Sequence, residues 1–552
     1  MTPESPIGPL GRIARVLASV GFAYWGLYAL VAPVTNIDSQ MYNIARLDLA
    51  MKGGLFKNDF FTSVYQVMWP WTFDAVYLPF VQLGWGYALP SFCCLAGACV
   101  VVFIMTRVRF GPDAAWVALL GLLGLTCLVY QGTSTKNDIP ILFAGAVWVY
   151  ARWRWQREGK GVHIFWMVLA IGFMAGAKTT GVLYGIILAL WTLWEFRGSR
   201  KRVLRIAAGL LGAFILFGSV ETYLESARLF GNPLGPPENF RQSRNPDGIR
   251  GGIANLSRFV VGSIYVGPTT YRSAPAAVSN LAGAEETFLS WTGTTGAGFD
   301  RRYPRRTLFF FQSGFEELSG FGPIGTIAMA TMLFACLRWR PGAVWWRLAA
   351  AAFLGLVLMS LTVAYTDWAN RYLISWYTLA TVAVVCALWE RETPFRRMLR
   401  WGFAAMAAAS AIAAPLLSFN RRPADIIASV RDRDRFETCA FPLAGKVRAR
   451  LRILSTEAPN RRLYFIAGND SVELPILEDR SLDVIFVTPP EFLRLAGSGR
   501  IGPGDLVVED IMIHSPLLTR IEEVSAPDMF SENTTRTEEI FRVSRMSVPL
   551  QP

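Results

Sequence analysis

Short polar motifs interrupt the long apolar runs of this 552-residue chain, and their residue types could do chemistry. A carboxylate such as Asp38 can accept the proton of a hydroxyl group that is positioned on it. Lysine and arginine, as at Lys178 and Arg371, suit an anionic group such as phosphate. The motifs are N-I-D-S-Q-M-Y at 36–42, T-S-T-K-N-D-I-P at 133–140, A-G-A-K-T-T-G at 175–181 and D-W-A-N-R-Y-L at 367–373.

The two acidic motifs also have simpler structural interpretations. Asp38 or Ser39 fits the N-cap of a helix that lies on the membrane surface. Asp138 fits a capping residue in a turn that precedes Pro140. Residue chemistry alone leaves both alternatives open.

The two basic motifs are open to a similar choice. Lys178 is flanked by apolar residues, where a charge costs about 2.5–3.5 kcal/mol, so a functional role is the default interpretation. The alternative is a lysine side chain that reaches the membrane surface. Arg371 suits phosphate through its guanidinium fork, or it simply pairs with the nearby Asp367.

The apolar runs that position these motifs predict a membrane protein. Hydrophobic residues make up 53% of the chain and charged residues 17%, against about 25% charged in soluble domains, and the mean hydropathy is +0.33. This composition excludes a disordered chain, a disulfide scaffold and an ordinary cytosolic enzyme. We expect a mostly α, polytopic membrane protein with about 11 transmembrane helices, near residues 14–34, 86–106, 113–131, 139–153, 162–177, 179–195, 206–222, 321–337, 347–365, 373–389 and 401–418.

The net charge of +13 predicts an orientation rather than a nucleic-acid partner. Arginine and lysine gather in alternate short loops, as the positive-inside rule requires of cytoplasmic loops. The N-terminus is therefore expected in the cytoplasm, and an odd number of spans places the tail outside. This parity depends on a helical hairpin at 162–195, in which Gly176 and Gly181 predict a break around Lys178.

Two outer loops and a polar tail complete the predicted organisation. Residues 1–419 form the membrane domain, with outer loops at 35–85 and 223–320, and Gln40–Met51 is expected to lie on the membrane as an amphipathic helix. Residues 420–552 are expected to form a small extracytoplasmic α/β domain. It would contain strands at 447–454, 462–467, 481–487 and 505–508 and a helix at 490–496.

Several chemistries are absent from the sequence patterns. The chain has only two histidines and no C-x-x-C pair, so neither a zinc site nor a disulfide framework is indicated, and we predict no metal-binding residues. It also lacks the phosphate-binding loop of ATP-driven motors, the G-x-S-x-G elbow and the H-E-x-x-H motif.

The motifs, in this order, resemble the GT-C superfamily of polyprenyl-phosphate-sugar-dependent glycosyltransferases over roughly residues 14–400. The likeness rests on Asp38 after the first span, Asp138 between the third and fourth spans, and Lys178, together with a G-N-P turn at 231–233 and the R-Y motif at 371–372. The F-P-L-A-G sequence at 441–445, before the predicted strands, looks like the start of the extracytoplasmic domain that some bacterial members append.

The resemblance implies a transfer reaction at the outer face of a bacterial cytoplasmic membrane. Asp38 would be the general base that activates an acceptor hydroxyl, with inversion at the sugar. Lys178 and Arg371 would bind the donor phosphate. Sugar or acceptor binding is assigned to Tyr42, Lys136, Asp138, Glu316 and Tyr372.

The resemblance also defines the expected ligands. The donor would be a polyprenyl-phosphate sugar, and the acceptor a glycan, a glycolipid or a protein, without nucleic acid. No cofactor is firmly indicated. A divalent cation stays an open alternative with weak support, because many members have two adjacent acids in this loop, whereas here Asp38 is followed by Ser39. The rival functions are a secondary transporter or a lipid or glycolipid flippase, and an O-antigen ligase or polymerase, which would use a pyrophosphate donor and a catalytic histidine.

Overall fold

The structure of the chain is a computed structural model. It describes residues 6–32, 46–47, 69–83, 85–237, 241, 244–264, 275–298, 320–366, 369–418, 421–431, 462–466, 484–487, 489–501, 505–509, 518–527 and 537–546.

Helices make up most of the described structure, and each predicted span overlaps one of them or a bent pair. The first half contains α1 (Pro9–Val31), η2 (Asp74–Tyr77), α4 (Leu78–Leu83), α5 (Leu89–Phe110), α6 (Pro112–Leu123), α7 (Thr126–Gly132), α8 (Asp138–Glu158), α9 (Gly161–Ala177), α10 (Thr179–Glu195), α11 (Arg200–Phe217) and α12 (Val220–Phe230). The second half contains α14 (Gly248–Ile264), α16 (Pro275–Trp291), α17 (Gly322–Leu337), α18 (Val344–Thr362), η5 (Ala369–Leu373), α19 (Ile374–Trp389), α20 (Pro394–Leu417) and α21 (Pro423–Arg431).

The helices confirm a multi-pass membrane protein. Within the described residues, five helices are long and apolar enough to cross a membrane, and seven if two bent pairs each count as one span. The pairs are α6 with α7, bent by 77°, and α11 with α12, bent by 72°. Three further apolar helices, α9, α10 and α17, are shorter. A total of about eleven crossings, and their orientation, stay predictions.

Local sequence signals mark where these helices end and where the next ones begin. Gly111, with φ of 90°, ends α5, and Pro112 at once begins α6. A positive φ suits glycine because it has no Cβ, and proline suits the first helical turn because its missing N–H has no partner there. Thr393 caps α20: its Oγ1 accepts a hydrogen bond from the Arg396 N–H at 3.2 Å.

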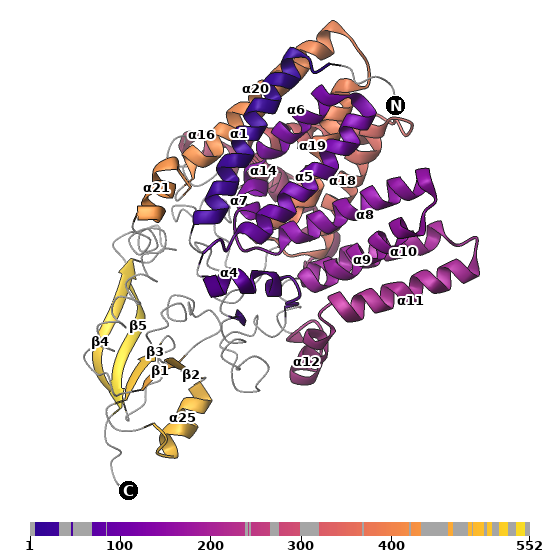
Figure 1. Cartoon of the computed structure of the whole chain (residues 1–552). Coiled ribbons are helices and arrows are strands. Elements are labelled where there is room, and N and C mark those ends of the chain that lie inside the picture. The colour runs from indigo at the N-terminus through magenta and orange to yellow at the C-terminus, as the bar shows by residue number, and fades with distance from the viewer. Residues whose placement is uncertain are drawn as a thin grey trace.

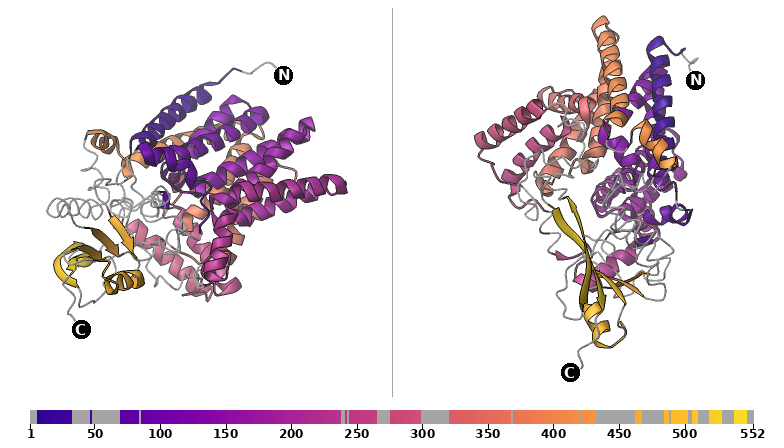
Figure 2. Two further views of the ribbon diagram at one scale, coloured as in Figure 1. Left: turned by 60° about the horizontal axis from the view of Figure 1, so that its bottom comes forward. Right: turned by 90° about the vertical axis from the view of Figure 1, so that its left-hand side faces the viewer.

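The core of the membrane part surrounds α6. Nine of the twelve residues of α6 are buried, and the helix contacts α1, α5, α19 and α20. Figure 1 shows these helices side by side, with α8, α9, α10 and α11 stacked beyond α5. The N-terminus and the C-terminal strands lie at opposite ends of the molecule (Figures 1 and 2), and α4 and α12 lie at the end nearer the strands.

The predicted hairpin at 162–195 is confirmed as α9 and α10, which meet at Lys178. Lys178 has an extended backbone, with φ of −164° and ψ of 152°, so the helix is broken there. Gly176 and Gly181 permit the close packing around the break. A Cβ at Gly176 would overlap the Phe217 carbonyl oxygen, and one at Gly181 would overlap that of Met174.

Replacing Gly181 with alanine should therefore destabilise the protein, by about 1–3 kcal/mol, because the new methyl group meets backbone that cannot rotate away. The measurement is thermal unfolding of the detergent-solubilised chain. Gly212→Ala is the matched control, because a Cβ at that position of α11 has nothing within 4 Å. Equal melting temperatures for the two variants would contradict the packing argument.

The predicted outer loop at 223–320 contains helices that sequence patterns did not indicate. Its first described residues continue α12, which ends at Gly231 in a left-handed turn with φ of 68°, as the G-N-P motif predicts. Further along, α14 packs against α17 and α18, and α16 packs against α14. This region therefore contributes packed helices to the molecule rather than only a connection between spans.

Three of the four strands predicted in the tail are present, and two further strands follow them. They form a five-stranded sheet in the order β2-β1-β3-β5-β4, from β1 (Leu463–Ile466), β2 (Val484–Val487), β3 (Leu506–Glu509), β4 (Leu518–Pro527) and β5 (Thr537–Met546). Strand β1 is parallel to β2 and β3, with Leu463 opposite Val484 and Leu506, while β5 is antiparallel to β3 and β4. The predicted helix is α25 (Pro489–Gly497), whose Phe492 packs with Tyr464 and Val507. The predicted strand at 447–454 lies outside the described residues, and a separate domain at 420–552 stays a prediction.

Candidate active site

The segment between α7 and α8 is polar and yet buried. Each residue from Thr133 to Asp138 is at most 8% exposed. Its turn is held locally, because Thr133 donates to the Val129 carbonyl at 2.8 Å and Ser134 to the Gln131 carbonyl at 3.0 Å. Buried polar side chains are retained where they are hydrogen-bonded or where they serve a ligand.

Asp138 and Lys178 form a buried ion pair within this region. The Lys178 Nζ donates to both carboxylate oxygens of Asp138, at 2.8 and 2.9 Å. The break between α9 and α10 makes the pair possible, since it brings the lysine to the first turn of α8. The two side chains are 5% and 11% exposed, so the lysine does not extend to the membrane surface.

The short helix η5 brings Arg371 and Tyr372 to the same pair. The Tyr372 ring lies under both cations, 5.0 Å from the Lys178 Nζ and 5.4 Å from the Arg371 Cζ. The positive charges of Lys178, Arg371 and Lys136 all act on the Asp138 carboxylate. A group of lysine and arginine side chains of this kind suits an anion with several oxygens, such as phosphate.

Tyr184 supports this cluster and was missed in the sequence. It lies on α10, and its hydroxyl donates to the Tyr372 carbonyl at 3.4 Å. Its ring packs against Trp376 with the centroids 5.4 Å apart. A tyrosine among apolar residues resembles a core residue, so only the contact with η5 shows that it holds the R-Y motif.

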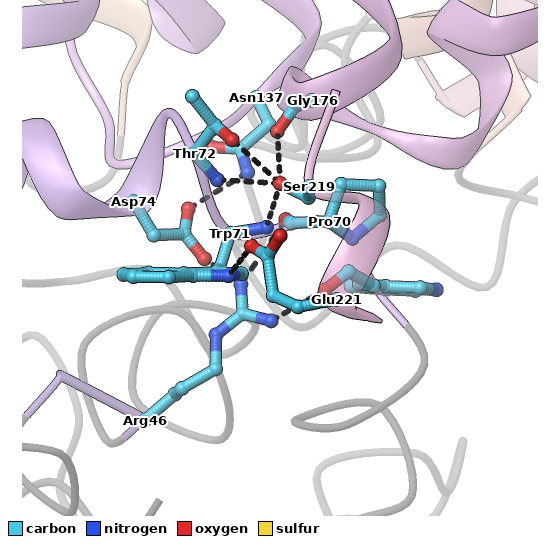
Figure 3. Close-up of polar contacts among 10 residues, drawn as sticks. Arg46, Pro70, Trp71, Thr72, Asp74, Asn137, Gly176, Ser219 and Glu221 are labelled. Atoms are coloured by element: carbon cyan, nitrogen blue, oxygen red, sulfur yellow. Dashed lines mark hydrogen bonds and ion pairs between the residues drawn. The ribbon is translucent and has the colours of Figure 1, made fainter. Parts of the chain in front are cut away.

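A second polar network, also missed in the sequence, joins the segment before α4 to the site. Asp74 is fully buried, pairs with the Arg46 guanidinium and accepts a hydrogen bond from the Asn137 Nδ2 at 2.8 Å. Figure 3 shows Asp74 between these partners. Burial lowers the pKa of Arg46 to about 9, which is still above neutral pH, so its guanidinium stays charged under ordinary conditions. The sequence signal that could have indicated Asp74 is its position as the lone acid in an aromatic stretch, W-P-W-T-F-D.

Ser219 fastens the same segment to the bend between α11 and α12. Its hydroxyl accepts hydrogen bonds from the backbone N–H groups of Trp71 and Thr72, at 3.1 and 2.9 Å, and contacts the Thr72 hydroxyl at 2.6 Å (Figure 3). Ser219 has φ of 54°, the one positive value outside glycine among the described residues. The bend thus holds residues 71–72 close to Gly176, two residues before Lys178.

A buried arginine connects the site region to the start of the tail. The Arg421 guanidinium donates to the Tyr130 carbonyl at 2.9 Å and to the Thr133 hydroxyl. Its Cζ lies 5.0 Å from the ring centroids of both Tyr28 and Tyr130. The Tyr24 hydroxyl donates to the Arg421 carbonyl, so α1, α7 and the segment after α20 meet at this residue.

Three assigned residues, Asp38, Tyr42 and Glu316, lie outside the described part of the chain. The same holds for most of the predicted helix at 40–51, of which Arg46 and Leu47 are described as helical. Within the described residues there is no group of three or more His, Cys, Asp or Glu side chains that could hold a metal ion. The structure therefore brings together Lys136, Asp138, Lys178, Arg371 and Tyr372.

Comparison with known proteins places this geometry in context. Residues 66–221, less than a third of the chain, match the family model described as dolichyl-phosphate-mannose-protein mannosyltransferase. No curated protein matches the chain in sequence.

The fold is shared with a solved structure over almost the whole chain. The crystal structure of ArnT from Cupriavidus metallidurans bound to undecaprenyl phosphate is 14% identical, with a TM-score of 0.54, and covers 98% of this chain and 99% of that chain. The apo crystal structure of ArnT is also 14% identical, with a TM-score of 0.48, and covers 97% and 98%. The shared fold and the match at 66–221 confirm the resemblance of this chain to the GT-C glycosyltransferases.

Proposed function

We propose that this protein transfers a sugar from a polyprenyl-phosphate donor to an acceptor hydroxyl at the outer face of a bacterial cytoplasmic membrane. The observation that carries the proposal is the buried group of Lys136, Lys178 and Arg371, whose charges all act on the Asp138 carboxylate. This group has the charge that a lipid phosphate requires. Support also comes from the shared fold with a protein that was crystallised with undecaprenyl phosphate.

The cations serve the leaving group of the proposed reaction. As the bond between the anomeric carbon and the phosphate oxygen breaks, negative charge develops on the phosphate. Lys178 and Arg371 stabilise that charge, and a buried site makes their effect larger than it would be in water. Asp138 holds the Lys178 ammonium by two hydrogen bonds, so its geometry is set before the donor arrives. Tyr372 lies beside both cations. In the proposed reaction its ring contacts the donor sugar.

Asp38 is the general base of the proposed reaction. It takes the proton of the acceptor hydroxyl as that oxygen attacks the anomeric carbon. Phosphate is already a good leaving group, so a second carboxylic acid is not needed, in contrast to the carboxylate pair of glycosidases. A single displacement inverts the anomeric centre. The mechanism uses no nucleotide sugar and routes no step through a metal ion.

The test is a transfer assay in membranes that contain the full chain. Each of several undecaprenyl-phosphate sugars, labelled in the sugar, is supplied in turn, and label in a new product is measured together with the released undecaprenyl phosphate. We expect transfer from at least one lipid donor, with inverted configuration by NMR, and none from the corresponding nucleotide sugars. Direct transfer from a nucleotide sugar would contradict the proposal. Movement of the intact lipid across the bilayer without sugar transfer would instead identify a flippase.

A further inference from the structure

Asp74 is a buried charge that the proposed reaction does not use directly. It is fully buried, in the short helix η2, and its carboxylate joins two segments that are far apart in the sequence. One oxygen pairs with Arg46, and the other accepts from Asn137 at 2.8 Å. A carboxylate loses several kcal/mol of hydration on burial, and replacing a buried pair by apolar residues is often neutral or stabilising. Stability alone therefore does not account for a charged group here.

On one side, Asp74 contacts Arg46, which belongs to the first predicted outer loop. Besides Asp74, the Arg46 guanidinium donates to the Trp69 carbonyl at 2.6 Å and to the Pro70 carbonyl at 3.3 Å. Three acceptors from one short segment fix the position of this planar group, since its N–H donors have a rigid geometry. Arg46 follows the candidate base, Asp38, by eight residues.

On its other side, Asp74 contacts Asn137, which lies next to the group of cations that act on Asp138. Asn137 precedes Asp138, whose carboxylate receives both hydrogen bonds from Lys178. A continuous set of polar contacts thus runs from Arg46 through Asp74 and Asn137 to the start of α8. Because the side chains along it are buried, a shift at one end is passed on rather than absorbed by water.

We propose that Asp74 is a positioning residue for the transfer reaction. It holds Arg46, which follows the proposed base by eight residues in the sequence, in register with the segment that carries Asp138, the partner of the phosphate-binding Lys178. The inference rests on the proposed function, in which Asp38 and Lys178 act on opposite sides of the anomeric carbon. A misplacement of about 1 Å can cost about 100-fold in rate, so a residue that sets this spacing affects kcat without touching the donor.

Asp74→Asn is the direct test. The new amide can still accept from Asn137, but it turns an N–H toward the Arg46 guanidinium and breaks the ion pair. We expect kcat to fall by about 10- to 100-fold. The KM for the lipid donor and the binding of undecaprenyl phosphate should stay within about twofold, because Lys178 and Arg371 are unchanged. A merely structural role would lower the folded fraction and leave the kcat of the folded protein unchanged, which would overturn the proposal.

Glu195→Gln is the matched control. It breaks another ion pair, with Arg152 at 2.8 and 3.0 Å, at the other end of α10, about 26 Å along the helix from Lys178. This variant should retain the wild-type kcat. If Asp74→Asn does not fold, the double variant with Arg46→Met and Asp74→Leu removes both charges and should fold. It should show the same loss of kcat.

Hydrogen exchange gives a second reading that needs no activity. Peptides covering residues 36–50 should exchange faster in Asp74→Asn than in the wild type or in Glu195→Gln. Unchanged exchange and unchanged kcat would overturn the role of Asp74 while leaving the proposed function intact. A wild-type protein without transfer activity would contradict the proposed function, and the exchange result alone would then decide whether Asp74 fixes the loop.

Discussion

Replacing Lys178 with glutamine should lower kcat for sugar transfer by about 10²–10³-fold, the loss seen when one pre-placed donor to a developing anion is removed. Glutamine keeps most of the side-chain volume but carries no charge toward the leaving phosphate. Binding should weaken as well, by about tenfold or more for undecaprenyl phosphate, since hydrogen bonds to charged groups contribute about 1.5–3 kcal/mol. Undecaprenol, which has no phosphate, should bind the wild type and the variant equally.

The control for this experiment must separate the loss of a cation from the loss of the fold. Removing one partner of a buried pair costs about 3–5 kcal/mol, so Asp138 left alone in Lys178→Gln could destabilise the protein. The double variant Asp138→Asn and Lys178→Gln has no unpaired charge at this pair and should regain stability but not activity. Lys160→Gln removes a lysine that is 68% exposed and should leave transfer unchanged. A Lys178→Gln protein with more than a tenth of the wild-type kcat would contradict the assignment.

Replacing Asp38 with asparagine should lower kcat by about 10²–10⁴-fold, the usual contribution of a general base. Here the affinity for undecaprenyl phosphate should not change, because the base acts on the acceptor side of the reaction. The two variants therefore differ in kind: Lys178→Gln loses both rate and lipid binding, whereas Asp38→Asn loses rate alone. Steady-state kinetics together with a lipid-binding titration in detergent separate them.

A nearby acid provides the comparison for Asp38→Asn. Asp48 lies in the same predicted loop and has no assigned role, so Asp48→Asn should keep the wild-type rate within about twofold. Full transfer activity in a folded Asp38→Asn protein would remove the proposed base and with it the single-displacement mechanism. Equal losses in the two variants would indicate that the loop tolerates no change of charge and would also contradict a specific role for Asp38.

The sequence permitted a good prediction of where the helices break and where charge enters the membrane part. Glycines at 176 and 181 around a lysine predicted the hairpin, because helix breakers and an intramembrane charge are local signals. The pairing of Lys178 with Asp138 could not be predicted in the same way. The two residues are 40 positions apart, and only the packing of α8 against α9 and of α9 against α10 brings them together.

The structure contradicts two of the simpler structural alternatives that residue chemistry left open. Asp138 is not the capping residue of α8: Asn137 occupies that position and makes no side-chain cap, while the Asp138 carboxylate binds Lys178. The interpretation of Lys178 as a lysine that extends to the membrane surface is likewise wrong, because its ammonium pairs with the buried carboxylate of Asp138. The N-cap alternative for Asp38 and the pairing of Arg371 with Asp367 involve residues outside the described part of the chain.

Asp74 and α14 show why the remainder escaped prediction. The aromatic residues around Asp74 predict a membrane interface. That prediction is the same whether or not the acid among them has a partner. Helix α14 has Gly and Arg residues that suggest a loop, yet Arg258 is fully buried in it and donates to the Ala297 carbonyl at 2.6 Å. Such contacts arise from tertiary packing, which short sequence windows do not contain.

The position of Arg421 determines how the tail can be removed without disturbing the rest of the protein. A chain shortened at residue 419, where composition marks the end of the membrane part, would lose the cation that lies between Tyr28 and Tyr130 and donates to Thr133. Inactivity of that chain would then be expected even if the strands had no part in catalysis. A deletion beginning after Arg431, the last residue of α21, keeps this connection and isolates the contribution of the strands.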